Sequence, residues 1–401
     1  MPLSRLSKPE FIGLMAIMMA VAAFSTDAML PAFPAIGAEL TPASPERTTL
    51  MVSLFMLGMG AGTFFTGPLS DAWGRKPVIL GGFLIYGIGS LVSWMAQDFT
   101  LMLVGRVLQG IGSAGARVVA PAMIRDLHAG RAMAQITSFI MTVFMIVPAM
   151  APMIGAFVID GFGWRAIFLA FVALALFASL WLSLRQEETL PLEKRRPISL
   201  ALLTSGVREV LSHRAVIGYT VVMTLGFTMI LTMISSIQPT YSKFGVVETF
   251  PTWFMAGALI AATGTLVNAW AVMRFGMRKL AYYAFVVQTI CAAIFAAVLV
   301  ILQPPATIGV WLFFAWAAQL FFMNGMTFGN LNALALQPLG HMAGLAASVI
   351  TALSTVGSAI IAGVVSLFAS ETLLVLVVES IICSGVSAYL MLKIDPVSKT
   401  A

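Results

Sequence analysis

Residues 11–36 read FIGLMAIMMAVAAFSTDAMLPAFPAI, an apolar run that contains one acidic residue, Asp27. A helix needs about 20 mostly apolar residues to cross a bilayer, and this run is long enough. An acid at the centre of a membrane helix costs about 2.5–3.5 kcal/mol on insertion scales, so it usually faces a polar cavity and has a function. Asp27 is therefore the first candidate functional residue.

The rest of the chain repeats this pattern. Of its 401 residues, 60% are hydrophobic and 9% are charged, whereas soluble proteins average about 25% charged residues. Apolar runs of helical length recur between short polar clusters, and helices satisfy their own backbone hydrogen bonds in lipid. We therefore predict an all-α integral membrane protein with twelve transmembrane helices. The predicted spans are 11–36, 48–70, 77–97, 101–124, 132–159, 165–184, 215–238, 250–273, 279–302, 307–332, 342–369 and 372–393.

The basic residues predict the orientation of these spans. Most of the 22 Lys and Arg residues fall in loops on the side that would hold both termini, and only Arg47, Arg165 and Lys243 fall in loops on the other side. Cytoplasmic loops carry an excess of Lys and Arg, so we expect both termini in the cytoplasm. The net charge of +6 then reflects topology, and we expect no nucleic-acid partner.

A long polar interval, residues 185–214, divides the chain. We predict an N-terminal six-helix bundle at 1–184, a cytoplasmic linker at 185–214 and a C-terminal six-helix bundle at 215–401. Within the linker, residues 200–211 suit either an amphipathic surface helix or a solvated segment. The sequence Trp73-Gly74-Arg75-Lys76 after the second span has a counterpart in residues 275–279, FGMRK, after the eighth. Two pseudo-symmetric halves with a substrate site between them at mid-membrane form a transporter architecture.

Several motifs resemble those of the major facilitator superfamily. Residues 67–76, GPLSDAWGRK, are similar to that family's signature between helices two and three, and residues 106–110, RVLQG, are similar to its fourth-helix motif. Pro148, Pro152 and Gly155 resemble the fifth-helix motif of its proton antiporters. Residues 25–34, STDAMLPAFP, resemble the drug/proton antiporters with twelve helices, in particular the Bcr/CflA group of multidrug efflux transporters.

This resemblance implies a conformational latch at the inner membrane surface. In the family, the acid of the helix two–three loop caps a neighbouring helix and pairs with basic groups in one state of the transport cycle. A contact made in only one state shifts the equilibrium by its own free energy, on the order of 1–3 kcal/mol. The residues expected to form this predicted latch are Gly67, Asp71, Gly74, Arg75, Lys76, Arg125 and Asp126.

Asp27 and Arg106 are the candidates for proton coupling. A carboxyl group balanced between burial and a neighbouring cation can exchange protons near neutral pH. Arg106 and Arg117 are eleven residues apart, about three helical turns, so both side chains lie on one helix face about 16 Å apart. Arg106 falls near the depth of Asp27. Arg117 lies closer to the cytoplasm, where it either holds an anionic part of the substrate or joins helices.

The candidate substrate contacts combine polar and aromatic side chains, as pockets for flat drug-like molecules do. They are Asp27, Arg117, Phe24, Phe55, Met145 and Asn324. Glu379, the acid inside the predicted spans of the second half, is either a second proton site or a packed acid near the outer surface. Residues 110–115, GIGSAG, match a dinucleotide-binding pattern, but no strand precedes them, so we interpret these glycines and Gly58 and Gly62 as helix-packing residues.

These observations predict a proton-coupled antiporter that exports drug-like small molecules across the bacterial inner membrane by alternating access, and so contributes to antibiotic resistance. The alternative is a proton-coupled transporter of a metabolite such as a siderophore, an amino acid or another anionic compound. A receptor or an intramembrane enzyme is disfavoured, because the sequence has no nucleotide loop, metal-ligand spacing or Ser/His constellation. We expect no cofactor or metal, the proton gradient as energy source, and a monomer in the lipid bilayer.

Overall fold

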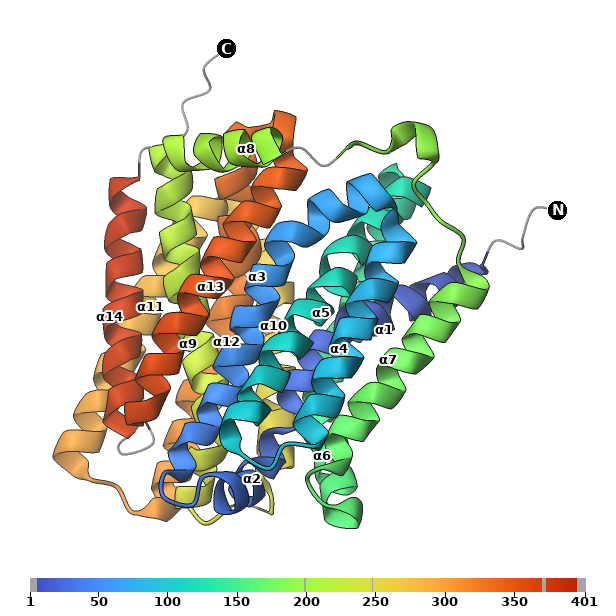
Figure 1. Cartoon of the computed structure of the whole chain (residues 1–401). Helices are drawn as coiled ribbons and strands as arrows, with labels where there is room; N and C mark the ends of the chain where they lie inside the picture. The colour runs from blue at the N-terminus through green and yellow to red at the C-terminus, as the bar shows by residue number, and fades with distance from the viewer. Residues whose placement is uncertain (1–5, 198–199, 247, 370–372, 395–401) are drawn as a thin grey trace. The chain divides into compact units, whose positions relative to one another are not determined.

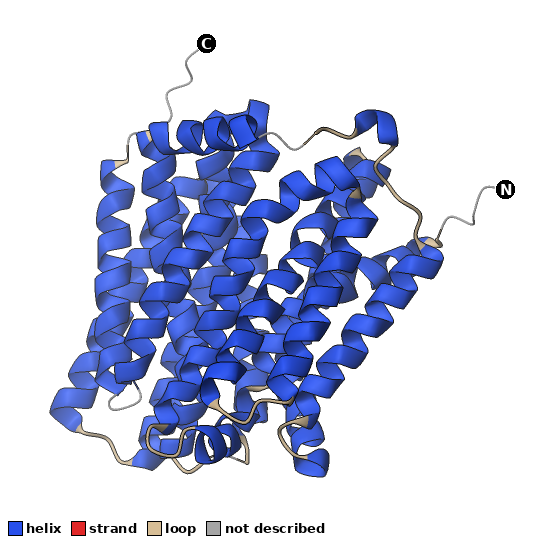
Figure 2. Cartoon of the chain, viewed as in Figure 1, coloured by secondary structure: helices blue, strands red, loops and turns tan. Residues whose placement is uncertain are grey.

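The computed structural model describes residues 6–197, 200–246, 248–369 and 373–394. Within these ranges, the side chains of residues 131, 132, 134, 138, 141–145, 200–203, 341 and 369 lie outside the description. The described part of the chain is almost entirely helical and contains no strand (Figure 2). The predicted all-α fold is confirmed.

The first of two compact units comprises Met1–Ala43 and Leu54–Leu200. The first span is broken after Asp27, where a short 3-10 helix, η1 (Leu30–Ala32), leads into α2 (Figure 1). The helices that build this unit are α1 Lys8–Asp27, α2 Phe33–Leu40, α3 Leu50–Trp73 from Leu54 onward, α4 Arg75–Trp94, α5 Phe99–Leu127, α6 Gly130–Phe162 and α7 Ala166–Arg185.

The second unit comprises Ser44–Ser53 and Ala201–Ala401. Its helices are α8 Leu200–Ser212, α9 Arg214–Lys243, α10 Phe250–Phe275, α11 Met277–Ala297, α12 Ala306–Leu336, α13 Ala343–Ala369 and α14 Leu373–Lys393. α8 runs across the ends of the longer helices of this unit (Figure 1). It buries Val210, exposes Leu211 and places Gly206 against Leu345, so the segment predicted as either a surface helix or a solvated linker is a helix.

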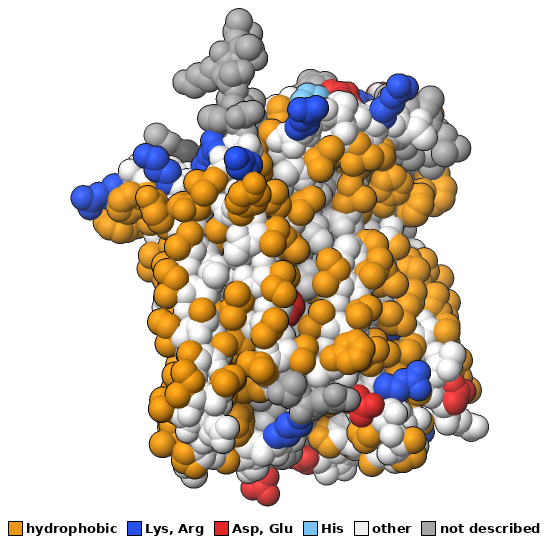
Figure 3. Space-filling model, turned by 90° about the vertical axis from the view of Figure 1, so that its left-hand side faces the viewer, with side chains coloured by type: hydrophobic (Ala, Val, Ile, Leu, Met, Phe, Trp, Pro, Cys, Tyr) orange, Lys and Arg blue, Asp and Glu red, His pale blue; other side chains and the backbone are white. Residues whose placement is uncertain are grey.

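The membrane spans match the prediction within a few residues at each end. Eleven helical segments of the described chain are long and apolar enough to cross a membrane, and α6, with 33 residues, corresponds to the remaining predicted span. On the face shown in Figure 3, hydrophobic side chains cover most of the middle, and charged side chains lie toward the two ends apart from one acidic side chain that is visible at mid-height. The predicted domain bounds, 1–184, 185–214 and 215–401, stay a prediction.

Small residues bring the helices of the first unit into close contact. A Cβ on Gly110 of α5 would overlap the backbone of α3 at Phe55, and a Cβ on Gly112 would overlap the backbone of α4 at Tyr86. Gly58 and Gly62 of α3 lie equally close to the backbone of α5. Small residues allow this close approach between membrane helices. The interpretation of these glycines as packing residues is confirmed.

Ion pairs fix α7 to the first span at both of its ends. At one end, Arg185 Nε donates a hydrogen bond to Glu10 Oε1 at 2.8 Å. At the other end, Glu39 accepts hydrogen bonds from Trp164 Nε1 and Arg165 Nη1, both at 2.7 Å. The first span, which carries Asp27, is therefore tied to α7 on either side of the acid.

Candidate functional site

Asp27 is the last residue of α1 and is buried, with 5% of its surface exposed. In the described part of the chain, its carboxylate forms no ion pair within 4.0 Å. The backbone next to it is tightly enclosed, because Gly155 of α6 lies so close to Ala28 that a Cβ there would overlap the Ala28 carbonyl oxygen. Among the described residues, Asp27 is thus a buried acid without a Lys or Arg at ion-pair distance.

Arg106 of α5 is completely buried. Its Nη1 donates a hydrogen bond to Gln109 Oε1 at 2.7 Å, and its guanidinium carbon lies 4.5 Å from the centre of the Phe55 ring of α3. A cation over an aromatic face is stabilised, more strongly when water is excluded. Residues of its own helix and of α3 therefore help to hold Arg106 in place.

A chain of polar contacts extends from Arg106 toward the helix that carries Asp27. Gln109 Nε2 donates to Ser90 Oγ of α4 at 2.6 Å, and Ser90 Oγ donates to the carbonyl oxygen of Tyr86 at 2.9 Å. The Tyr86 hydroxyl is hydrogen-bonded to Ser25 Oγ, two residues before Asp27. Residues of α4 therefore link Arg106 to the segment around Asp27. We expected the two charged side chains at a similar depth, but in the described chain they form no ion pair.

Arg117 is half-buried and faces α3, as Arg106 does. Its Nη1 contacts Met59 Sδ at 3.2 Å, and Met59 is one helical turn beyond Phe55, which contacts Arg106. No ion pair within 4.0 Å is present for Arg117 in the described chain. Its proposed contact with an anionic part of the substrate stays a prediction.

The other predicted substrate contacts are dispersed. Phe24 is half-buried and packs edge-to-face on Phe171, with ring centres 5.9 Å apart. Asn324 lies half-buried on α12 in the second unit, whereas the side chain of Met145 lies outside the described residues. Their part in a common pocket stays a prediction. Pro148, Pro152 and Gly155 all lie in α6, and the two prolines are inside the helix.

The predicted latch centres on Arg75, at the start of α4. Arg75 Nη1 bonds Asp71 Oδ1 at 2.5 Å and Ser70 Oγ at 2.8 Å, and Arg75 Nε bonds Asp126 Oδ2 at 3.0 Å. Ser70 in turn donates to the carbonyl oxygen of Gly67 at 2.8 Å. One guanidinium therefore joins the end of α3, the start of α4 and the end of α5.

Two other expected members of the latch behave differently. Lys76 donates to the carbonyl oxygens of Ser183 and Gln186 near the end of α7, both at 2.8 Å. Arg125 is exposed, and no ion pair within 4.0 Å is present for it in the described ranges. The structure therefore brings Asp126 to Arg75 but does not bring Arg125 into this cluster.

Glu188 is a member of this cluster that the sequence reasoning missed. Its Oε1 accepts a hydrogen bond from the backbone N–H of Arg75 at 2.9 Å, and its Oε2 accepts one from the backbone N–H of Lys76 at 3.0 Å. Thr189 Oγ1 also donates to Asp126 Oδ2 at 3.1 Å. The only sequence signal for these residues is a run of acids beside a run of basic residues in the linker.

The glycine turn that precedes α4 recurs before α11 in the second unit, where the basic side chain after it has different partners. Gly276 precedes α11 with φ 79°, as Gly74 precedes α4 with φ 106°. Arg278, in the position that matches Lys76 or Arg75, donates to the carbonyl oxygens of Met391 at 2.9 Å and Ile394 at the end of α14. A basic side chain near a helix C-terminus is favourable there. The predicted repeat thus shares its backbone turn but not its ion pairs.

Comparison with known proteins identifies the family. The family model described as Major Facilitator Superfamily matches residues 15–362. The chain belongs to the major facilitator superfamily. It is therefore a multi-pass membrane protein of a family of transporters, not of enzymes, and transporters of this family carry small molecules.

Individual superfamily members support this assignment. The chain is 27% identical over 364 residues to the bicyclomycin resistance protein homolog of Haemophilus influenzae, covering 90% of each chain. It is 32% identical over 210 residues to the multidrug resistance protein MdtL of Salmonella heidelberg, covering 52% of each chain. A crystal structure of a D-xylose-proton symporter has a TM-score of 0.75 at 15% identity, covering 97% of this chain and 98% of that chain, which shows the shared fold.

Proposed function

We propose that this transporter exports drug-like small molecules across the bacterial inner membrane in exchange for protons, with Asp27 as the group that binds protons and substrate in turn. The family and the names of the two relatives support drug efflux, and they do not favour the metabolite alternative. The observation that carries the mechanism is the burial of Asp27 without an ion pair in the described chain. Such a carboxyl group can exchange one bound partner for another.

The energy source in this proposal is the proton gradient, without a cofactor. A proton that moves down a potential of 100 mV releases about 2.3 kcal/mol of free energy, and antiport can use this free energy to move substrate against its gradient. We further propose a monomer with both termini in the cytoplasm, as the distribution of Lys and Arg supports. The latch residues Asp71, Arg75 and Asp126 would then lie at the cytoplasmic surface.

Arg106 has a supporting role in this proposal. Its contacts with Gln109 and Phe55 hold the guanidinium in a fixed position, and the contacts through Ser90 and Tyr86 reach Ser25 on the helix of Asp27. These contacts join Arg106 to the helix of Asp27 without placing the guanidinium in a direct ion pair with the carboxylate. We propose that this arrangement leaves the carboxylate available to a proton or a cationic substrate.

The test uses the purified protein in proteoliposomes that contain a pH-sensitive dye. Addition of ethidium or bicyclomycin to the wild-type protein should change the lumenal pH, because substrate and proton exchange. Asp27→Asn should abolish this substrate-driven change in lumenal pH. Substrate binding to the variant is measured in a separate experiment. Asp160→Asn, at an exposed acid of α6, is the matched control and should behave as the wild type. Full coupling in Asp27→Asn would refute the assignment.

A further inference from the structure

The start of α11 and the end of α14 lie side by side at one end of the second unit. Arg278 of α11 donates hydrogen bonds to the carbonyl oxygens of Met391 at 2.9 Å and of Ile394, in the last turn of α14 and just after it. Farther along, Gln288 of α11 donates to Ser380 Oγ of α14 at 2.9 Å. The two helices therefore pack together in opposite directions and form one two-helix surface, the α11–α14 face.

Both helices of this face carry an exposed lysine at this end and an exposed tyrosine four residues farther along. The pairs are Lys279 and Tyr283 on α11 and Lys393 and Tyr389 on α14. Residues four apart lie on one side of a helix, so each tyrosine lies one turn below its lysine. The Lys393 ammonium lies 5.8 Å from the centre of the Tyr389 ring. Since α11 and α14 run in opposite directions, the two Lys–Tyr pairs lie at the same end of the face.

Beyond the tyrosines, the exposed side of both helices is apolar. The exposed residues that continue it are Val287, Ile290 and Ile294 on α11 and Val386, Ile382 and Val378 on α14. Figure 3, viewed from the side on which α11 and α14 lie in Figure 1, shows Lys and Arg side chains at one end beside hydrophobic side chains. Tyrosine is enriched where headgroups meet hydrocarbon, and lysine extends its charge into the headgroups. The order lysine, tyrosine, apolar residue therefore follows the depth of one leaflet.

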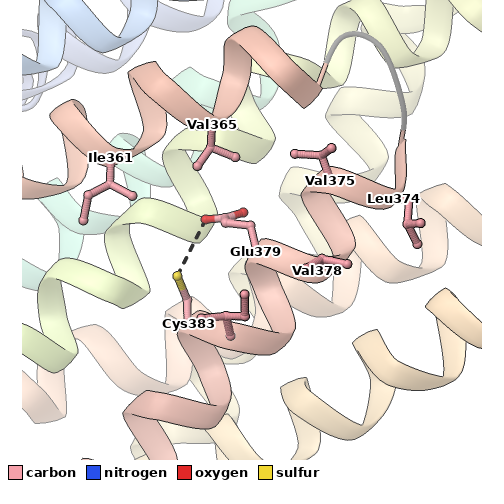
Figure 4. Close-up of a pocket in the computed structure, with 8 residues that line it drawn as sticks. Ile361, Val365, Leu374, Val375, Val378, Glu379 and Cys383 are labelled. Carbon is pink, nitrogen blue, oxygen red and sulfur yellow. Dashed lines mark hydrogen bonds between the residues drawn. The ribbon is translucent and has the colours of Figure 1, made fainter.

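The two lysines carry a positive charge that no ion pair neutralises. Within the described ranges, neither lysine has an acidic group within 4.0 Å. The sequences of α9, α11 and α14 contain one acid, Glu379, which is 14 residues and about 21 Å along α14 from Lys393. Glu379 is buried, and Cys383 Sγ donates to its Oε1 at 3.9 Å (Figure 4). Asp395 lies outside the described residues. The lysine end of the face is thus suited to an anionic group.

We propose that the α11–α14 face binds an anionic phospholipid, whose phosphate lies between Lys279 and Lys393 and whose acyl chains lie along the apolar side of both helices. Basic residues at the ends of membrane helices attract anionic headgroups. A phosphatidylcholine has a cation beside its phosphate and no net charge, so its attraction to two lysines is weaker. A soluble phosphate ester has no chains for the apolar part of the face. The proposal does not depend on Asp27, on proton coupling or on the side of the membrane at which this end lies.

Native mass spectrometry of the full-length protein in detergent tests the proposal. The probe is dioleoyl phosphatidylglycerol, and dioleoyl phosphatidylcholine, with the same chains, is the control without net charge. We expect the first bound phosphatidylglycerol to saturate at a lower concentration than the first phosphatidylcholine. In the double variant Lys279→Gln/Lys393→Gln, the phosphatidylglycerol concentration for half-saturation should rise about thirtyfold, which is the joint contribution of two lysines near an anionic membrane surface.

Two further double variants separate a specific site from a general effect of charge. Lys194→Gln/Arg208→Gln removes the same charge from exposed residues outside the face and should bind as the wild type does. Lys279→Arg/Lys393→Arg keeps both charges and should retain binding, so the result does not depend on the glutamine variant being stable. Equal affinity for the two lipids, equal affinity of the two glutamine variants, loss of binding in the arginine variant, or displacement of the lipid by an equal concentration of glycerol 3-phosphate would overturn the proposal.

Discussion

The carboxylate of Glu188 accepts the backbone N–H of Arg75 at 2.9 Å, across 113 residues of sequence. Gly74, the residue before α4, has no side chain that could satisfy the free N–H groups of the first helical turn, and Glu188 satisfies two of them. A negative charge at a helix N-terminus also interacts favourably with the helix dipole. The segment after α7 is thereby fixed to the loop that holds the predicted latch.

This cap predicts that Glu188→Ala destabilises the protein. The substitution leaves the N–H groups of Arg75 and Lys76 without their acceptor, which should cost about 0.5–2 kcal/mol, as the loss of a capping side chain does. The midpoint of thermal unfolding in detergent, followed by tryptophan fluorescence, measures the effect. Glu187→Ala removes a neighbouring exposed acid and should leave the midpoint unchanged. Equal effects of the two substitutions would mean that Glu188 acts only through net charge.

Gly74 and Gly276 form a matched pair for a second prediction. Both have positive φ with ψ near 160°, a region that only glycine adopts readily, so alanine at either position should cost about 1–3 kcal/mol through backbone strain. At Gly276 a Cβ would meet open space, whereas at Gly74 it would lie 2.5 Å from Glu188 Oε2 and 2.9 Å from Arg195 Nη2. Gly74→Ala should therefore lower the unfolding midpoint more than Gly276→Ala. If the two are equal, the contact with Glu188 adds nothing to the requirement for glycine.

Gln109 provides a third prediction because it joins Arg106 to Ser90. Gln109→Leu keeps the size of the side chain but removes both hydrogen bonds, including the one from a buried charge. Leaving a buried polar group without its acceptor costs about 1–3 kcal/mol, so the unfolding midpoint should fall clearly. Ser113→Ala is the control on the same helix, because the Ser113 hydroxyl donates to the Gly110 carbonyl oxygen of its own turn. A fall in the control as large as in Gln109→Leu would argue against a specific role of the Arg106 contact.

The pattern of apolar residues along the chain determined which features of this protein could be predicted from its sequence. Hydrophobic run lengths located the spans, because a helix must satisfy its hydrogen bonds within the membrane. The resemblance of the loop at 67–76 implied that Asp71 pairs with basic groups, and the structure pairs it with Arg75. The contact of Arg75 with Glu188 was not predictable, because periodicity does not say which distant segment returns to a helix end.

The same limit applies to Asp27 and Arg106. Counting residues along two helices gave similar depths in the membrane, but depth does not determine how each helix is rotated. The structure turns Arg106 toward Phe55 and Gln109, and a tyrosine of α4 forms the contact with the first helix. Rotation was decided by the close packing of α5 against α3 and α4, which depends on glycines whose partners the sequence does not name.

Gly155 gives the sharpest functional prediction, because it packs against the residue next to Asp27. A methyl group at this position would overlap the backbone carbonyl of Ala28, which no side-chain movement can relieve, so Gly155→Ala must shift α6 or the end of α1. Gly161→Ala lies on the same helix and meets no atom within 4 Å. In proteoliposomes, Gly155→Ala should reduce ethidium-driven proton exchange at least tenfold, because misplacing a reacting group by about 1 Å can cost a hundredfold. Gly161→Ala should retain exchange. Retention by both variants would show that Asp27 tolerates movement of its helix, and that the packing of α6 against α1 does not position the acid for coupling.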